Sequence, residues 1–118
     1  MESGVRRGSG LTSSVIDGLR YTLRLVIRSF ASRDTERLWN RERARSIDPR
    51  GQRTALRKLR QVGSAVSLRD LPSPPGNRLE ALVGYRAGQH SIRINDQWRI
   101  CFTWTDAGPE EVEIVDYH

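Results

Sequence analysis

This sequence of 118 residues contains one cysteine, Cys101, and one lysine, Lys58. A single cysteine forms neither an internal disulfide nor a cysteine cluster for a metal ion, so neither kind of stabilisation is expected. Long apolar runs are also missing, because charged residues interrupt every candidate stretch and none approaches the ~18 residues of a membrane span. The same interruptions argue against a secretion signal after Arg6 and Arg7. We therefore expect a cytoplasmic protein that makes no membrane contact.

Basic charge is present in excess. The 20 lysine and arginine residues outnumber the 14 acidic residues and give a formal net charge of +6. Because Lys58 is the only lysine, almost all of this charge is arginine. The planar guanidinium group binds phosphate through two hydrogen bonds and stacks on bases, which favours a nucleic-acid partner. A general preference for arginine codons explains the composition equally well, so both interpretations stay open.

The length allows one domain, and the start of the chain differs from the rest. Residues 1–25 are rich in serine and glycine and carry a few apolar residues at helical spacing, which predicts a flexible or partly helical extension. This extension is either a native segment or upstream sequence translated from a misassigned start. Residues 26–30 alternate like a short strand, and we expect 26–118 to form the domain.

Two helices are predicted before residue 65. The first has Ser32 as its N-cap. The second opens at Asp48 and Pro49, where the aspartate caps and the proline takes the first helical position, and it is expected to end at Gly63. One face of this helix is apolar, and the opposite face is basic without acidic residues. The basic residues predicted to contact RNA from this helix are Arg53, Arg57, Arg60 and Lys58.

After residue 78 the period of the pattern changes to two. Residues 91–95 and 98–104 alternate between apolar and polar types, which predicts two half-buried strands joined by a tight turn at 95–97. A last strand is expected around Val112. The fold class is thus α+β, with two N-terminal helices packed on one face of a small antiparallel sheet. Arg93 and Arg99 then point to the opposite, open face.

Residues 79–82, 91–102 and 112–118, together with the stretches 55–59 and 74–79, resemble the HigB branch of the RelE-like toxins. The similarity covers residues 26–118. It implies a microbial-RNase-like fold and the toxin of a type II toxin-antitoxin system, an endoribonuclease that enters the ribosomal A site and cuts mRNA. It also implies that the enzyme needs no metal ion or other cofactor, and that its protein partner is a helix-turn-helix antitoxin of the HigA type.

The resemblance implies that the 2′-hydroxyl of the mRNA attacks the neighbouring phosphate. Three tasks arise: a proton is removed, the phosphorane is neutralised and the leaving oxygen is protonated. Arg99 is expected to stabilise the phosphorane, and His118 and Asp116 are the candidates for acid and base. Tyr117 is expected to stack on a base or to orient one.

Three further residues complete the predicted site. Glu80 stands where some relatives carry a catalytic histidine, so it is either the base or an ion-pair partner of Arg78 or Arg99. Arg93 and Arg86 are expected to support the RNA backbone.

Close relatives commonly carry aspartate, lysine and tyrosine where this chain has Tyr85, Ala87 and His90. These differences bear on substrate preference and potency more than on the fold. Two other functions stay open. One is a gyrase-inhibiting toxin of the same superfamily, against which the acid and base groups of the terminal triplet argue. The other is a catalytically inactive protein that binds RNA or the antitoxin.

Overall fold

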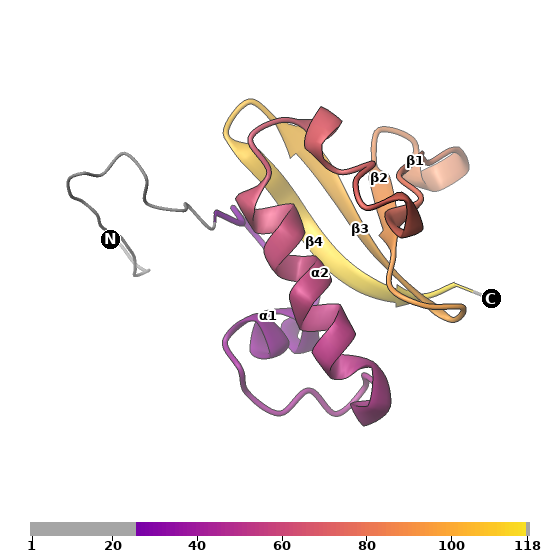
Figure 1. Ribbon diagram of the computed structural model, residues 1–118. Helices are drawn as coiled ribbons and strands as arrows, with labels where there is room; N and C mark the ends of the chain where they lie inside the picture. The colour runs from indigo at the N-terminus through magenta and orange to yellow at the C-terminus, as the bar shows by residue number, and fades with distance from the viewer. Residues whose placement is uncertain (1–25, 118) are drawn as a thin grey trace, which may run out of the picture.

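The computed structural model describes residues 26–117, which form two α-helices and a four-stranded sheet (Figure 1). The helices are α1 (Arg33–Trp39) and α2 (Gln52–Ser64), and the strands are β1 (Glu80–Ala81), β2 (His90–Arg93), β3 (Trp98–Thr105) and β4 (Gly108–Asp116). Short 3-10 helices lie between them: η2 (Pro49–Gly51), η3 (Leu68–Asp70), η4 (Pro75–Asn77) and η5 (Gly84–Arg86). The predicted α+β class is confirmed. The predicted extension, 1–25, and His118 lie outside the described residues.

The sheet is antiparallel throughout, with the strand order β1-β2-β3-β4. Both helices pack against β4, and α2 crosses the face of the sheet (Figure 1). The core between these layers is made of buried apolar side chains, among them Leu59, Val62, Ile92, Ile100 and Phe102. Strand alternation therefore sends the intervening residues of β2 and β3 to the face that the helices do not cover.

Helix α1 begins where the sequence predicts. The hydroxyl of Ser32 accepts a hydrogen bond from the Thr35 amide at 3.0 Å, which satisfies one of the free N–H groups of the first turn. Thr35 is fully buried, and its hydroxyl accepts a hydrogen bond from the Ile114 amide at 2.9 Å. The first turn of α1 is thereby joined directly to β4.

The start of the second helix is confirmed, but its predicted end is wrong. Asp48 caps the 3-10 turn η2, which leads into α2. Gly63 lies in the last turn of α2, which ends at Ser64. A Cβ at this position would come within 2.9 Å of Trp39 Cη2. The glycine therefore permits close packing of α1 on α2 and does not terminate the helix. No helix within residues 26–117 has the length and apolarity needed to cross a bilayer.

Residues 26–31 run beside β4, but they do not form the predicted strand. Phe30 makes one parallel bridge with Val112, and the Arg28 amide donates to the Pro109 carbonyl at 2.8 Å. Glu111 interrupts regular pairing, because its φ of 52° is left-handed and turns its amide to the Ser29 hydroxyl. The segment still covers the outer edge of β4.

Candidate active site

Arg99 lies at the centre of the sheet face that the helices do not cover. Its Nε donates to the Ser91 hydroxyl at 2.8 Å, and its Nη2 donates to the carbonyl oxygens of Arg78 at 2.6 Å and of Ser91 at 3.4 Å. The predicted face is correct, but the predicted openness is wrong, since Arg99 is only 8% exposed. Ser91 and Arg99 share one face of neighbouring strands, which is why the side chains meet.

Two more groups flank the guanidinium group of Arg99. Oε1 of Glu80 lies 3.6 Å from Nη2, so the predicted ion pair between these residues is present. The ring centroid of Tyr117 lies 5.5 Å from Cζ, which is within the range of a cation–π contact. Glu80 and Tyr117 are both more than a third exposed, so they form the solvent-facing side of the group. Within residues 26–117 no hydrogen bond uses Nη1 of Arg99.

A hollow of about 360 Å³ opens beside this cluster. The residues that line it are Glu80, Ala81, Leu82, Val83, Tyr85, Arg86, Val115, Asp116 and Tyr117. They come from β1, η5 and the end of β4, so three segments that are distant in sequence meet here. The hollow brings together two carboxylates, two phenol rings and one arginine, Arg86. The arginine and the rings suit a ligand with phosphate groups and bases.

Arg86, predicted to contact the RNA backbone, is held beside the hollow. Its Nη1 donates to Gln89 Oε1 at 2.9 Å, and its Nη2 lies 3.4 Å from Glu113 Oε1. Cys101 is fully buried on the same face, and burial raises the pKa of its thiol. A buried thiol of raised pKa is a poor nucleophile, so Cys101 contributes packing to this site.

The chain end returns to the sheet as predicted, but its side chains separate. Tyr117 lies on the Arg99 face, whereas Asp116 pairs with Trp98, and its carboxylate accepts a hydrogen bond from Gln97 Nε2 at 3.1 Å. Successive side chains of a strand point to opposite faces, which explains the separation. Asp116 borders the hollow, yet its carboxylate is directed away from Arg99 and toward the Gln97 turn.

His90 lies on the helix-covered face of the sheet. It is stacked on Phe102 with the ring centroids 6.4 Å apart, and its Nδ1 is buried without a hydrogen-bond partner. The imidazole therefore does not supply an acid or base to the Arg99 cluster.

The basic residues predicted on α2 divide into two groups. Arg53 and Arg57 are exposed and Arg60 is half-buried, as expected for an outer stripe. Lys58 is 6% exposed, and its ammonium group donates to the Asn77 side chain, so its predicted place with the RNA-binding arginines is wrong. Burial also lowers the pKa of Lys58, with smaller effects from neighbouring arginines. Arg93, predicted to support the RNA backbone, is ion-paired with Asp96.

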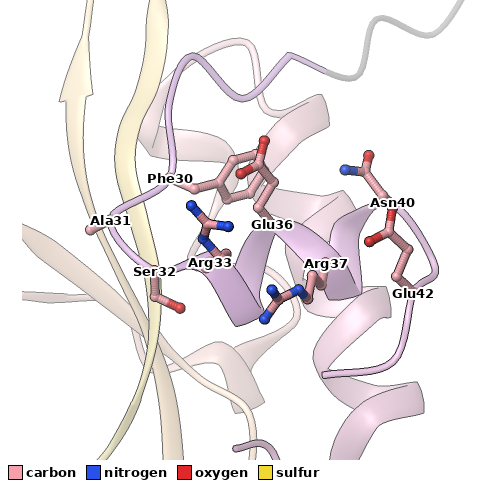
Figure 2. Close-up of a pocket in the computed structure, with 8 residues that line it drawn as sticks. All are labelled: Phe30, Ala31, Ser32, Arg33, Glu36, Arg37, Asn40 and Glu42. Atoms are coloured by element: carbon pink, nitrogen blue, oxygen red, sulfur yellow. The ribbon is translucent and has the colours of Figure 1, made fainter. Parts of the chain in front are cut away.

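A larger hollow of about 610 Å³ lies along α1 (Figure 2), and it shares no lining residue with the smaller hollow. Its lining runs from Phe30 to Glu42 and mixes acidic and basic side chains. None of the predicted site residues lines it, so we take the smaller hollow as the candidate active site. Across residues 26–117 no three histidine, cysteine, aspartate or glutamate side chains gather closely enough to hold a metal ion.

Comparison with known proteins identifies the family of the chain. Residues 28–118 match the family described as HigB-like toxin, the RelE-like toxin of the type II toxin-antitoxin system HigB. A similar curated protein is Toxin HigB-1 of Vibrio cholerae serotype O1. It is 37% identical over 78 residues, which cover 65% of this chain and 82% of the relative.

Proposed function

The chain belongs to the HigB family of RelE-like toxins of type II toxin-antitoxin systems, and from this premise we propose that it cleaves mRNA on the ribosome. A toxin of this class has an antitoxin as its partner. We further propose that this antitoxin is a helix-turn-helix protein of the HigA type, and that the toxin acts in the cytoplasm. Gyrase inhibition and simple RNA binding are the competing outcomes of the experiment described below.

The observation that carries this proposal is the fixed guanidinium group of Arg99. Three hydrogen bonds hold its Nε and Nη2, and the two exposed residues that contact the group, Glu80 and Tyr117, line the adjacent hollow. A cation that is already oriented stabilises the charge that develops on a phosphorane without rearranging during the reaction. Arg99 is therefore assigned to the phosphorane oxygens.

The remaining tasks are assigned to groups around Arg99. Glu80 removes the proton from the 2′-hydroxyl, whose oxygen then attacks phosphorus to form a cyclic phosphate. The 5′-oxygen of the next nucleotide leaves with a proton from His118. Tyr117 stacks on a base beside the scissile phosphate, since its ring is half-exposed at the hollow. The reaction balances without a metal ion or cofactor.

We assign Asp116 no direct contact with the reacting atoms. Its carboxylate accepts a hydrogen bond from Gln97 and is directed away from Arg99. Arg86 lies beside the hollow and is assigned to the phosphate backbone, with Arg93 further along the same face. The exposed arginines of α2, Arg53 and Arg57, lie on the other side of the molecule and are assigned to ribosomal RNA. A protein bound in the ribosomal A site contacts RNA on more than one side.

The test is cleavage of a reporter mRNA positioned on purified ribosomes. Wild-type protein is compared with Arg99→Ala and His118→Ala, and with Arg33→Ala as a matched control, because Arg33 is an exposed arginine on α1. We expect cleavage only on ribosomes, a loss of about 100-fold or more for Arg99→Ala, and wild-type rates for Arg33→Ala. Full activity of Arg99→Ala would refute its assigned role. A folded wild-type protein that cuts nothing would favour gyrase inhibition or RNA binding instead.

A further inference from the structure

We propose that Ser91 and Asn77 are positioning residues, which together build a cradle that fixes the guanidinium group of Arg99. This inference rests on the proposed function, because it concerns the residue assigned to the phosphorane. Neither residue was singled out by the sequence pattern, and neither touches the hollow where RNA would bind.

The first wall of the cradle is Ser91. It is fully buried, and both its hydroxyl and its carbonyl oxygen accept hydrogen bonds from Arg99. A buried charge is tolerated only when its hydrogen-bonding groups are satisfied, and a guanidinium group has five donors in a rigid plane. Two acceptors on one residue of the adjacent strand therefore define both the position and the plane of the group.

The second wall is the backbone carbonyl of Arg78, which accepts the shortest hydrogen bond of Arg99 at 2.6 Å. Arg78 is left-handed, with φ of 46° and ψ of 59°. This conformation is uncommon for a residue with a side chain, and it persists only where the surroundings enforce it. Something next to Arg78 must therefore hold the carbonyl in place.

Asn77 is the group that does so. It is fully buried, and its Nδ2 donates to Gln61 Oε1 and to the Leu71 carbonyl, each at 3.0 Å. Its Oδ1 accepts a hydrogen bond from the ammonium group of Lys58 on α2. With its side chain satisfied on both sides, Asn77 anchors the turn to the helix layer, and Arg78 follows it directly in the chain.

The cradle also explains why the solvent-facing side of Arg99 is left for substrate. Glu80 is 3.6 Å away and its side chain is 54% exposed, so it is a weak restraint on the arginine. The strong, buried contacts all lie on the Ser91 and Arg78 side. One edge of the guanidinium group is thus held by protein, while the other is available to a phosphorane oxygen.

Chemical rescue tests the cradle in the full-length protein. Free guanidinium at tens of millimolar is added to Arg99→Ala in the ribosome cleavage assay, where it can occupy the space that the side chain leaves. We expect partial recovery of cleavage. We expect no recovery in the double variants Arg99→Ala/Ser91→Ala and Arg99→Ala/Asn77→Ala, because each lacks one wall.

The single variants give a second readout. Ser91→Ala and Asn77→Ala should lower kcat by about 10- to 100-fold with little change in KM, because a misplaced catalytic group slows chemistry more than binding. Ser29→Ala is the matched control, since it removes a serine hydroxyl that bonds Glu111 far from the site. Ser91→Thr, which keeps the hydroxyl, should restore part of kcat.

Three results would overturn the cradle: wild-type kcat for Ser91→Ala, no rescue of Arg99→Ala by guanidinium, or equal rescue with and without Ser91. Each of them leaves the loss of activity in Arg99→Ala intact. The proposed function fails by a different result, which is full cleavage by Arg99→Ala itself. If Asn77→Ala does not fold, the kcat and rescue measurements on the Ser91 variants decide whether the cradle positions Arg99.

Tyr85 carries an independent inference at the same hollow. It is 96% exposed, and its neighbour Val83 is 84% exposed, which is unusual for large apolar side chains. Cζ of Arg86 lies 5.8 Å from the ring centroid, and the ion pair with Glu113 keeps this arginine in place. We infer that Tyr85 is a stacking site for an unpaired RNA base.

The location favours a base over a protein side chain. Tyr85 and Tyr117 both line the hollow, so two exposed rings flank the place where the scissile phosphate is proposed to lie. A ring backed by a guanidinium group is a common platform for unpaired bases, because every base presents a π-face.

The test is the KM for mRNA cleavage on ribosomes. Tyr85→Ala should raise KM by about 10-fold with kcat nearly unchanged, and Tyr85→Phe, which keeps the ring, should restore the low KM. Val66→Ala is the matched control, because Val66 is 89% exposed outside the hollow. An unchanged KM in Tyr85→Ala would overturn the inference. Equal impairment by Tyr85→Phe would also overturn it, since the hydroxyl and not the ring would then matter.

Discussion

At the scale of single residues, the main feature is a buried cation without a strong carboxylate partner. Isolated charges are costly to bury, and Arg99 is stabilised mainly by neutral oxygens of Ser91 and Arg78. Neutral acceptors hold the group in position and leave its positive charge largely uncompensated. A guanidinium group in this state stabilises the negative charge of a phosphorane more strongly than one paired closely with a carboxylate.

Asp34 provides a prediction about pH. Hydrogen bonds from the Ser46 hydroxyl and amide, and then from Arg37, lower the pKa of Asp34 from 3.8 to about 2. A carboxylate whose pKa is lower in the folded state stabilises the fold above pH 3.8, and this contribution is lost as the pH falls toward 2. Asp34→Asn should therefore flatten the pH dependence of the free energy of unfolding in this range.

Urea denaturation at several acidic pH values measures that slope. Asp106→Asn is the control, because Asp106 is exposed in the turn between β3 and β4, and it should keep the wild-type slope. An Asp34→Asn slope equal to that of wild type would mean that the bonds from Ser46 do not stabilise the fold.

The sequence predicts contacts between side chains in the site better than contacts made by backbone atoms. Of the two ion-pair partners predicted for Glu80, Arg78 and Arg99, the structure contains the pair with Arg99. The hydrogen bond from Arg99 to the Arg78 carbonyl cannot be predicted from the sequence, because every residue has a backbone carbonyl. Lys58 was misplaced although a signal existed: with Ala55, Leu59 and Val62 it follows the spacing of a buried helix face.

At the scale of elements, the contact between the two helices depends on Gly63. Alanine is normally favoured over glycine inside a helix by roughly 1 kcal/mol. Here its Cβ would lie 2.9 Å from the rigid indole of Trp39. Gly63→Ala should therefore lower the free energy of unfolding by about 1–3 kcal/mol, as overpacking does in a close-packed core.

Urea denaturation checks this, with Gly76→Ala as the control, because a Cβ at Gly76 would meet no atom within 4 Å. The control should be neutral or slightly stabilising. A Gly63→Ala protein more stable than wild type would show that the helices separate at little cost.

The outer face of α2 predicts a dependence on salt. Replacing Arg53, Arg57 and Arg60 by alanine should weaken ribosome association. It should also reduce the magnitude of the slope of log K against log salt concentration by roughly 2, because binding with fewer phosphate contacts releases fewer counterions. Co-sedimentation across a salt series measures the slope. Exchange of Arg28, Arg33 and Arg69, which are exposed arginines outside α2, serves as the matched control. An unchanged slope for the α2 variant would exclude this face from RNA contact.

At the scale of the whole molecule, the described residues form one folded domain with its own hydrophobic core. Within residues 26–117 the helices and the sheet enclose this core, and the segment 26–31 covers the outer edge of β4. A chain that starts at Val26 keeps this edge segment and serves as the reference for shorter chains. A chain that starts at Ser32 should lose about 3 kcal/mol or more, because it lacks Phe30 and the backbone bonds to β4.

Thermal and urea unfolding of the two chains test this. Equal stability of the Val26 and Ser32 chains would mean that the edge segment contributes nothing. The alternating pattern predicted an extended segment at residues 26–30 but not its neighbour, since a contact with Val112 across 82 positions in sequence depends on how the whole sheet closes.

That same contact sets the order of events during synthesis. β4 is made after β1, β2 and β3, and it is the strand with which the first described segment pairs. Both helices pack on β4 as well, so neither the sheet nor the helix layer can be completed before β4 leaves the ribosome. Folding of the described residues is therefore completed only after nearly all of them have been synthesised.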